Sequence, residues 1–280
     1  PQMNRATDWG LFSPQAESHL QSVMGLQTYN SIRAVDFLQS LPEVDRERIA
    51  ITGASGGGTQ SFVLAAIDPR IKVSVPAVMV STAMQGGCTC ENACCLRVGT
   101  GNVDFAALVA PRPQLLTAAN DWTREMQTKG FPQLQQHYRM MGAADHVRLH
   151  ARIEFGHNYN LPSRLAMYHW LNKHLQLGLK EPIVEADFQR LTTAEMTVWD
   201  ENRHPRPEGG EQFEQKLLRH WHHDSQQQLA DLTPRDAPGL KRYRRVAGGA
   251  LSTLIGRGLP VAADISYERT TKEDRGTYIE

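Results

Sequence analysis

A serine lies between glycines in the segment Gly53-Ala54-Ser55-Gly56-Gly57, which has the spacing G-x-S-x-G. This spacing is typical of a sharp strand-to-helix turn that leaves the serine hydroxyl exposed above a sheet. Glycines two residues before and after Ser55 would let neighbouring segments pack closely. The following helix would present its N-terminus, where negative charge is favoured. The pattern predicts a nucleophile at Ser55 and an oxyanion donor at the backbone N–H of Gly56, although a simple packing turn has the same glycines.

A serine hydroxyl is a weak nucleophile unless a base, itself oriented by a carboxylate, takes its proton. Asp121 follows the apolar run 114–119, and His157 follows the run 147–153. Both would lie at the carboxyl ends of strands, where ligands bind in open α/β sheets. We therefore predict the triad Ser55, Asp121 and His157. Asp104 and Asp145 are rivals for the acid, but their placement is less favourable.

The remaining histidines have simpler interpretations. His146 and His150 flank or lie inside a strand, and His169 and His174 lie on a helix. His220, His222 and His223 form a possible metal cluster, but adjacent helical positions point apart and no acidic or cysteine partner has ligand spacing. A solvated helix face is the better interpretation there, and we predict no metal and no organic cofactor.

The four cysteines, Cys88, Cys90, Cys94 and Cys95, fall in one short segment. Their C-x-C-x-x-x-C-C spacing lacks the second knuckle of an ordinary zinc site. A disulfide of Cys88 or Cys90 with Cys94 or Cys95 would suit an exported protein. Free packing thiols are the next alternative and a metal site the last.

Apolar runs and helical periodicities alternate along the first 180 residues. Residues 23–41 have helical spacing that ends at Leu41-Pro42, since proline disfavours a helix in the residue before it. Further helices are expected at 59–67, at 131–141 and after an N-cap at Ser163. Short strands are expected at 48–52, 71–80, 114–119 and 147–153. Such alternation predicts an α/β fold with a mostly parallel sheet and helices on both faces.

Composition limits the other possibilities. The 280 residues carry 30 Lys and Arg against 30 Asp and Glu, which argues against a generic nucleic-acid-binding surface. No apolar run approaches 18 residues, so we expect no membrane span. We expect residues 1–180 to form a catalytic domain, 181–245 a polar connector with a helix at 213–229, and 246–280 the start of a further domain. A strand-like run, Val246 to Leu259, opens this last segment.

At these motifs the sequence resembles the acetyl xylan esterase-like branch of the α/β-hydrolase superfamily. The matching segments are 26–34, 52–60, 85–95, 121–123 and 156–160. The resemblance implies an α/β-hydrolase fold, a serine esterase and an acetylated carbohydrate as substrate. It also implies that the first strands of the fold precede Pro1 in a longer, bacterial protein, together with a second oxyanion donor. Export is suspected from the resemblance and the cysteine cluster.

The expected reaction is acyl transfer through an acyl-enzyme, with a small-molecule or polysaccharide ester as substrate. Trp122 and Tyr159, beside the acid and the base, are candidates to stack on a sugar ring, and both could equally be core aromatics. Gln85, in a loop expected over the active site, is a third candidate for substrate binding. The alternatives are a hydrolase-fold domain that binds carbohydrate or a partner without turnover, and a prolyl oligopeptidase-like peptidase.

Overall fold

The structure of the chain is a computed structural model that describes residues 9–11, 13–207, 209–255, 260–266, 268 and 276. Contacts within the chain group it into two units, residues 1–227 and 228–280. The domain boundaries expected at residues 180 and 245 stay predictions.

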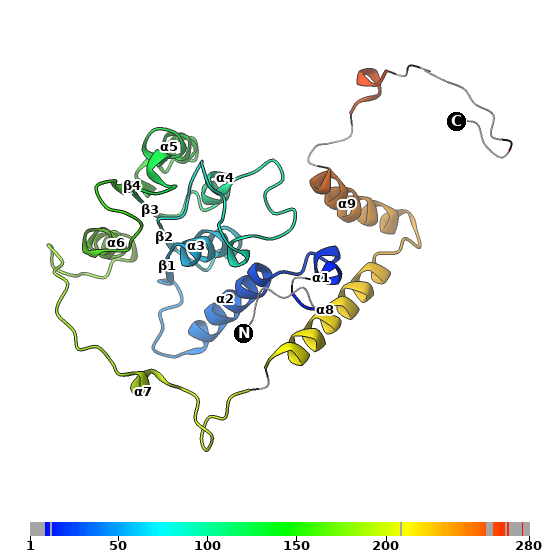
Figure 1. Cartoon of the computed structure of the whole chain (residues 1–280). Coiled ribbons are helices and arrows are strands. Elements are labelled where there is room, and N and C mark those ends of the chain that lie inside the picture. The colour runs from blue at the N-terminus through cyan, green and yellow to red at the C-terminus, as the bar shows by residue number, and fades with distance from the viewer. Residues whose placement is uncertain are drawn as a thin grey trace. The chain divides into compact units, whose positions relative to one another are not determined.

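A four-stranded parallel sheet forms the centre of the first unit (Figure 1). Its strands are β1 (Ala50–Ala54), β2 (Val73–Ala77), β3 (Gln114–Ala119) and β4 (Val147–Arg152). They lie side by side in chain order, with Thr52 opposite Val75 and Thr117 opposite His150. Because all the pairs are parallel, the loops that follow the strands lie at one edge of the sheet. The predicted α/β fold with its parallel sheet is confirmed.

Helices cover both faces of this sheet. On one face lie α3 (Gly56–Ile67), α4 (Asn102–Ala107) and α5 (Gly130–Met140), and α2 (Val23–Ser40) packs on α3. On the other face lies α6 (Leu161–Leu175), as Figure 1 shows. The alternation of β3 explains this arrangement, since Leu115 packs with α6 while Leu116 joins the cluster of α3 and α5.

The remaining elements are short or peripheral. They are α1 (Pro14–Ser18), the 3₁₀ turns η1 (Thr89–Glu91), η2 (Arg124–Gln127) and η3 (Ala144–His146), α7 (Thr193–Met196), α8 (Glu211–Asp231), α9 (Ala237–Leu254) and the 3₁₀ turn η4 (Ala262–Asp264). The polar helix expected at 213–229 corresponds to α8.

Two local predictions were wrong. The run Val246 to Leu259 is not a strand, because α9 extends through Leu254 and residues 256–259 lie outside the described residues. Its large apolar residues recur every three or four positions, which suits a helix, and Asp236 caps the start through the Gly239 N–H. Ser163 is not the N-cap of α6. That cap is Asn160, whose side chain accepts the Ser163 N–H, with Pro162 in the first turn.

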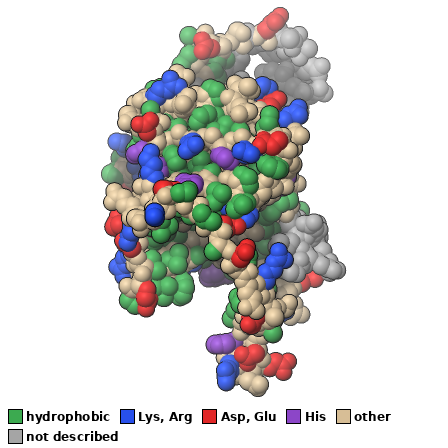
Figure 2. All heavy atoms as spheres, turned by 90° about the vertical axis from the view of Figure 1, so that its left-hand side faces the viewer, with side chains coloured by type: hydrophobic (Ala, Val, Ile, Leu, Met, Phe, Trp, Pro, Cys, Tyr) green, Lys and Arg blue, Asp and Glu red, His purple; other side chains and the backbone are tan. Residues whose placement is uncertain are grey.

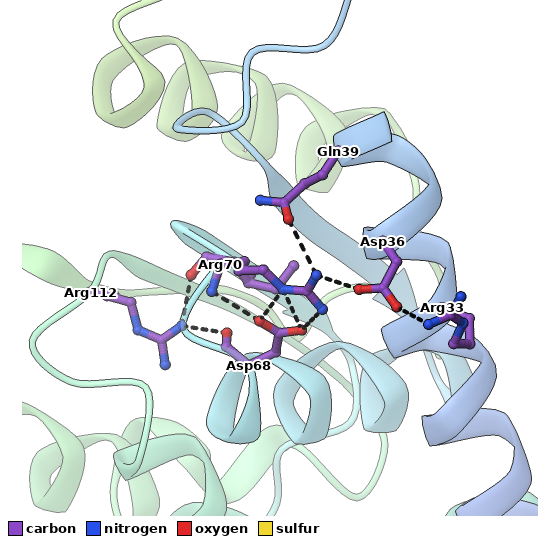
Figure 3. A network of polar contacts seen from close by, with 7 residues as sticks. Arg33, Asp36, Gln39, Asp68, Arg70 and Arg112 are labelled. Atoms are coloured by element: carbon purple, nitrogen blue, oxygen red, sulfur yellow. Dashed lines mark hydrogen bonds and ion pairs between the residues drawn. The ribbon is translucent and has the colours of Figure 1, made fainter. Parts of the chain in front are cut away.

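A network of arginines and aspartates lies at the amino end of the sheet, before β2 and β3 (Figure 3). Arg70 forms ion pairs with Asp68 at 2.6 Å and with Asp36 of α2 at 2.5 Å. The Arg70 hydrogen bonds hold the pKa of the Asp68 carboxyl below its usual range. Arg112 donates to the carbonyls of Ala65 and Asp68, which satisfies the C-terminal end of α3, and to the carbonyl of Ile71 just before β2. The network ties α2, α3 and the two strands together.

Acidic and basic side chains are interspersed on the face that Figure 2 shows, without a large patch of either sign. This distribution agrees with the formal net charge of zero. In the part of the chain that the structure describes, no helix has the length and apolarity that crossing a membrane requires.

Candidate active site

Ser55 occupies a strained turn between β1 and α3. Its backbone has φ 58° and ψ −123°, a region that residues other than glycine seldom adopt. The neighbouring strand β2 holds this turn in place, because the Ser55 N–H donates to the Ala77 carbonyl at 3.0 Å. Strain of this kind, fixed by neighbouring hydrogen bonds, is the local geometry that G-x-S-x-G predicts.

Close packing in this turn depends on two glycines, of which one was expected. A Cβ on Gly53 would lie 2.4 Å from the carbonyl oxygen of Gly57, and a Cβ on Gly58 would lie 2.7 Å from the Met79 Cβ. A Cβ on Gly57 would meet no described atom of another segment within 4 Å. The expectation that a glycine is needed at position 57 for close packing is therefore wrong, because a side chain there would have room. The glycine that the packing requires after Ser55 is Gly58, which lies against the segment after β2.

Gly56 is the first residue of α3, so its N–H has no carbonyl partner within the helix. The N–H of Ser55, in contrast, is already used by Ala77. This leaves the Gly56 N–H available to a developing oxyanion at the positive end of the helix dipole. The geometry is consistent with the role predicted for Gly56.

Asp121 and His157 are brought together by the loops after β3 and β4. The His157 Nδ1 lies 2.7 Å from the Asp121 Oδ2. The Asp121 side chain is only 5% exposed, and its other oxygen accepts the backbone N–H and the hydroxyl of Thr123, at 2.7 and 2.5 Å. The carboxylate is therefore fixed at one oxygen and directed at the imidazole by the other.

The two loops are also joined through backbone and ring contacts. The Asn120 N–H donates to the Phe155 carbonyl at 2.7 Å, which fixes the distance between the loops. The Trp122 ring lies over His157, with 4.5 Å between ring centroids and 39° between planes. These contacts hold the imidazole in position, while its side chain stays 35% exposed.

Tyr159 extends the loop after β4 back across the sheet to β1. Its hydroxyl lies 2.7 Å from the Thr52 hydroxyl, and its ring packs against the apolar cluster at the ends of β2 and β3. Burial raises the pKa of the Tyr159 hydroxyl. Tyr159 thus brings the segment that carries His157 toward β1, the strand that Ser55 directly follows. No hydrogen bond joins the Ser55 hydroxyl to His157 among the described residues, and such bonds are often long before substrate binds.

The residues proposed for substrate binding are used inside the protein at least in part. The Tyr159 hydroxyl is engaged as above, and the Trp122 ring contacts His157. The Gln85 Oε1 accepts the Asn102 N–H at 2.7 Å, which braces the loop after β2. A role in substrate binding stays a prediction for all three.

The four cysteines are free thiols in the structure, so the expected disulfide is not formed here. The sulfurs of Cys94 and Cys95 lie 3.6 Å apart. Burial raises the pKa of the Cys90 thiol to about 11, which keeps it protonated at neutral pH. Among the residues that can be described, no cluster of three or more His, Cys, Asp or Glu side chains could hold a metal ion.

The other acids and histidines have structural contacts. The Asp104 carboxylate caps α4 through the Gly101 N–H, and Asp145 is exposed in η3. His146 contacts the Pro111 carbonyl, His169 forms an ion pair with Glu181, and His174 packs on Trp170. His222 pairs with His19 at 2.7 Å rather than with His220 or His223.

Two residues of this region were not predicted. Thr123 orients Asp121, and the spacing D-x-T, an Asx-type turn, is the signal that could have identified it. Glu91 is nearly buried, 5% exposed, beside Gly56. It follows Cys88 by three residues, the spacing of a capping box, and it is the acidic residue of the segment 85–100.

Comparisons with known proteins agree with this geometry. Residues 27–82 match the family model described as acetyl xylan esterase (AXE1). A 44-residue segment is 43% identical to the acetyl esterase Axe7A of Xylanibacter ruminicola, and covers 16% of this chain and 10% of that protein. The solved structure of methylesterase BT1017 is similar with a TM-score of 0.53 and 31% identity, over 60% of this chain and 38% of that chain.

A glucuronoyl esterase of carbohydrate esterase family 15 from Caldicellulosiruptor kristjansonii has the same fold, with a TM-score of 0.50 and 18% identity, over 64% of this chain and 57% of that chain. The chain thus spans less than two thirds of the length of each of these relatives. Together the matches confirm the resemblance to acetyl xylan esterase-like proteins and the α/β-hydrolase fold.

Proposed function

We propose that the protein is a serine carboxylic-ester hydrolase that acts on a carbohydrate ester. The observation that carries this proposal is the 2.7 Å contact between His157 Nδ1 and Asp121 Oδ2, at the same edge of the sheet as the strained Ser55. A carboxylate-bound imidazole at the same edge of the sheet as a strained, half-buried serine has the parts of an acyl-transfer site. The esterases among the similar proteins support the same class of reaction.

In this proposal His157 Nε2 takes the Ser55 proton as the hydroxyl attacks the ester carbonyl. Asp121 holds the tautomer with Nδ1–H and stabilises the imidazolium that forms. The Gly56 N–H donates to the oxyanion. The imidazolium then protonates the leaving alcohol, and water, activated by the same His157, hydrolyses the acyl-enzyme and restores Ser55.

We infer that the ester the protein hydrolyses is an acetyl ester of a sugar hydroxyl. The family model and the Axe7A match, both described by acetyl esters, support this choice. The structure of a methylesterase is also similar, and a methyl ester would place the sugar on the acyl side rather than on the leaving group. Acetate release and methanol release therefore distinguish the two possibilities.

The test is labelling of the protein with a fluorophosphonate, followed by peptide mapping. We expect an adduct on Ser55 that is lost in Ser55→Ala and in His157→Ala. Acetylated xylan and methyl-esterified pectin are then assayed in parallel. We expect acetate release from the xylan and no methanol release from the pectin. Folded protein that gives no adduct would refute the proposal and favour a domain that binds carbohydrate without turnover. An adduct with methanol release alone would overturn only the acetyl assignment.

A further inference from the structure

Glu91 lies in the loop after β2 as a nearly buried carboxylate. Its Oε2 accepts the N–H groups of Gly87 and Cys88, at 2.5 and 3.3 Å, and so closes the turn around η1. The residue is 5% exposed. One oxygen of Glu91 therefore has a structural role that the proposed mechanism does not use.

The other oxygen, Oε1, accepts no hydrogen bond within the described part of the chain. This oxygen is not fully buried, so water reaches it although the residue as a whole is nearly buried. A carboxylate oxygen that is open to solvent and has no protein donor can accept a hydrogen bond from a bound molecule in place of water.

The unengaged oxygen faces the nucleophile turn. It lies 3.3 Å from the point where a Cβ on Gly56 would stand. The Oε1 is therefore within about 6 Å of the Gly56 N–H, given ordinary backbone bond lengths. A substrate whose carbonyl oxygen is held by Gly56 would place the atoms next to its ester against Glu91.

A negative charge so near a developing oxyanion would disfavour it unless a positive charge compensates. Arg97 is the basic residue of this loop, and its charge interacts with that of Glu91. Arg97 is held by Asn92 and Asn102, and its Nη2 is buried without a partner. The two side chains form no ion pair among the described residues, but the opposite charge of Arg97 offsets part of the charge that Glu91 brings to the loop.

We propose that Glu91 Oε1 accepts a hydrogen bond from a sugar hydroxyl adjacent to the ester, and so makes the site select esters of polyhydroxylated alcohols. This inference rests on the proposed function. A hydroxyl donates well to a carboxylate, and a charge-assisted bond of this kind discriminates strongly against an alcohol that lacks the hydroxyl.

The experiment compares two soluble esters in wild-type protein and in Glu91→Gln. One is a monoacetylated methyl xyloside with free hydroxyls beside the acetate, and the other is its analogue with hydrogen at those positions. For wild type we expect kcat/KM to be about 10–100-fold higher for the hydroxylated ester. In Glu91→Gln, whose amide oxygen can still accept the Gly87 N–H, this ratio should fall below about 3-fold.

Asp104→Asn is the matched control. Asp104 also caps a helix start through a backbone N–H, at 2.8 Å, in the same connection between β2 and β3. Its substitution removes a charge and weakens a cap, as Glu91→Gln does, but Asp104 belongs to α4. The control should keep the wild-type ratio between the two esters.

A wild-type ratio near one would overturn the inference even if Glu91→Gln failed to fold. An equal loss on both esters in Glu91→Gln would also overturn it, since that result indicates a structural role alone. p-Nitrophenyl acetate separates this failure from that of the proposed function. Wild type that hydrolyses it through Ser55 but shows no preference for the hydroxylated ester refutes only the role of Glu91, whereas no hydrolysis of any ester refutes both.

Discussion

The loops after β2 and β3 each carry a nearly buried carboxylate, and the two carboxylates differ in what their second oxygen meets. In each case one oxygen is fixed by neighbouring donors of the same loop, Thr123 for Asp121 and two backbone amides for Glu91. The second oxygen of Asp121 meets His157, whereas that of Glu91 meets no described donor. One carboxylate has both oxygens engaged by protein groups, and the other keeps one oxygen open to solvent or to a ligand.

This difference separates two kinds of contribution to a reaction. A carboxylate that orients a base acts on every substrate, because every reaction uses the same proton transfer. A carboxylate with an open oxygen affects only substrates that carry a hydrogen-bond donor for it. Substitutions that leave the loops in place can therefore test whether the two carboxylates act in these different ways.

Asp121→Asn is expected to have the largest effect. The amide can present an N–H to Nδ1 and so favour the wrong tautomer of His157, which should lower kcat by about 10³–10⁴-fold. The loss should be the same for p-nitrophenyl acetate and for acetylated sugars. A loss confined to sugar esters would place Asp121 in substrate recognition and erase its contrast with Glu91.

Tyr159→Phe should have a smaller effect on the same proton transfer. It removes the 2.7 Å hydrogen bond to Thr52, and with it about 1 kcal/mol of the interaction that ties the His157 loop to β1. We expect kcat to fall about 2–10-fold with KM unchanged. Thr52→Val is the partner variant; it also removes the hydrogen bond from the Thr52 hydroxyl to the Val75 carbonyl, so the double variant should lose no more than Thr52→Val alone. Additive losses would show that the pair does not act as one contact.

The smallest expected effect separates the stability of the protein from its chemistry. Burial lowers the pKa of His174 to about 4, helped by the charges of Lys173 and His146. The unfolded chain, with an ordinary pKa of about 6.5, binds the proton first as pH falls. Stability should therefore decrease between pH 6.5 and 4.

Thermal unfolding between these pH values checks this prediction. In His174→Leu, the drop in Tm between pH 6.5 and pH 4 should be about 2–4 °C smaller than in wild type. Since Trp170 packs on the ring, a leucine keeps an apolar contact there. The pH profile of kcat should not change, because His174 is not among the residues of the site. An unchanged slope of Tm against pH would show that another group controls the acid sensitivity.

The sheet and the placement of Asp121 and His157 could be predicted because they depend on local patterns. Short apolar runs bounded by turn residues predict parallel strands, and whatever follows such strands lies at one edge of the sheet. The strand predicted at 246–259 failed because a run of small and apolar residues suits a helix as well, and the capping Asp236 lies outside that run.

Glu91 could not be recognised in the same way. Its importance depends on burial and on its distance from Gly56, and both result from how an irregular loop folds over α3. A single glutamate among cysteines and glycines has no periodicity that would indicate its surroundings. The cap of α6 shows the same limit on a smaller scale, since Asn160 and Ser163 are both good caps and only the backbone geometry decides between them.

The arginine network of Figure 3 lies at the opposite end of the strands from this chemistry. Arg70 and Arg112 connect helices and strands through Asp36, Asp68, two carbonyls at the end of α3 and one carbonyl just before β2. None of these groups contributes to the triad. Substitutions in the loops after the strands can therefore alter specificity without weakening these ties. During evolution, the loops at one end of the strands can therefore change and accept new substrates, while the contacts at the other end keep the domain folded.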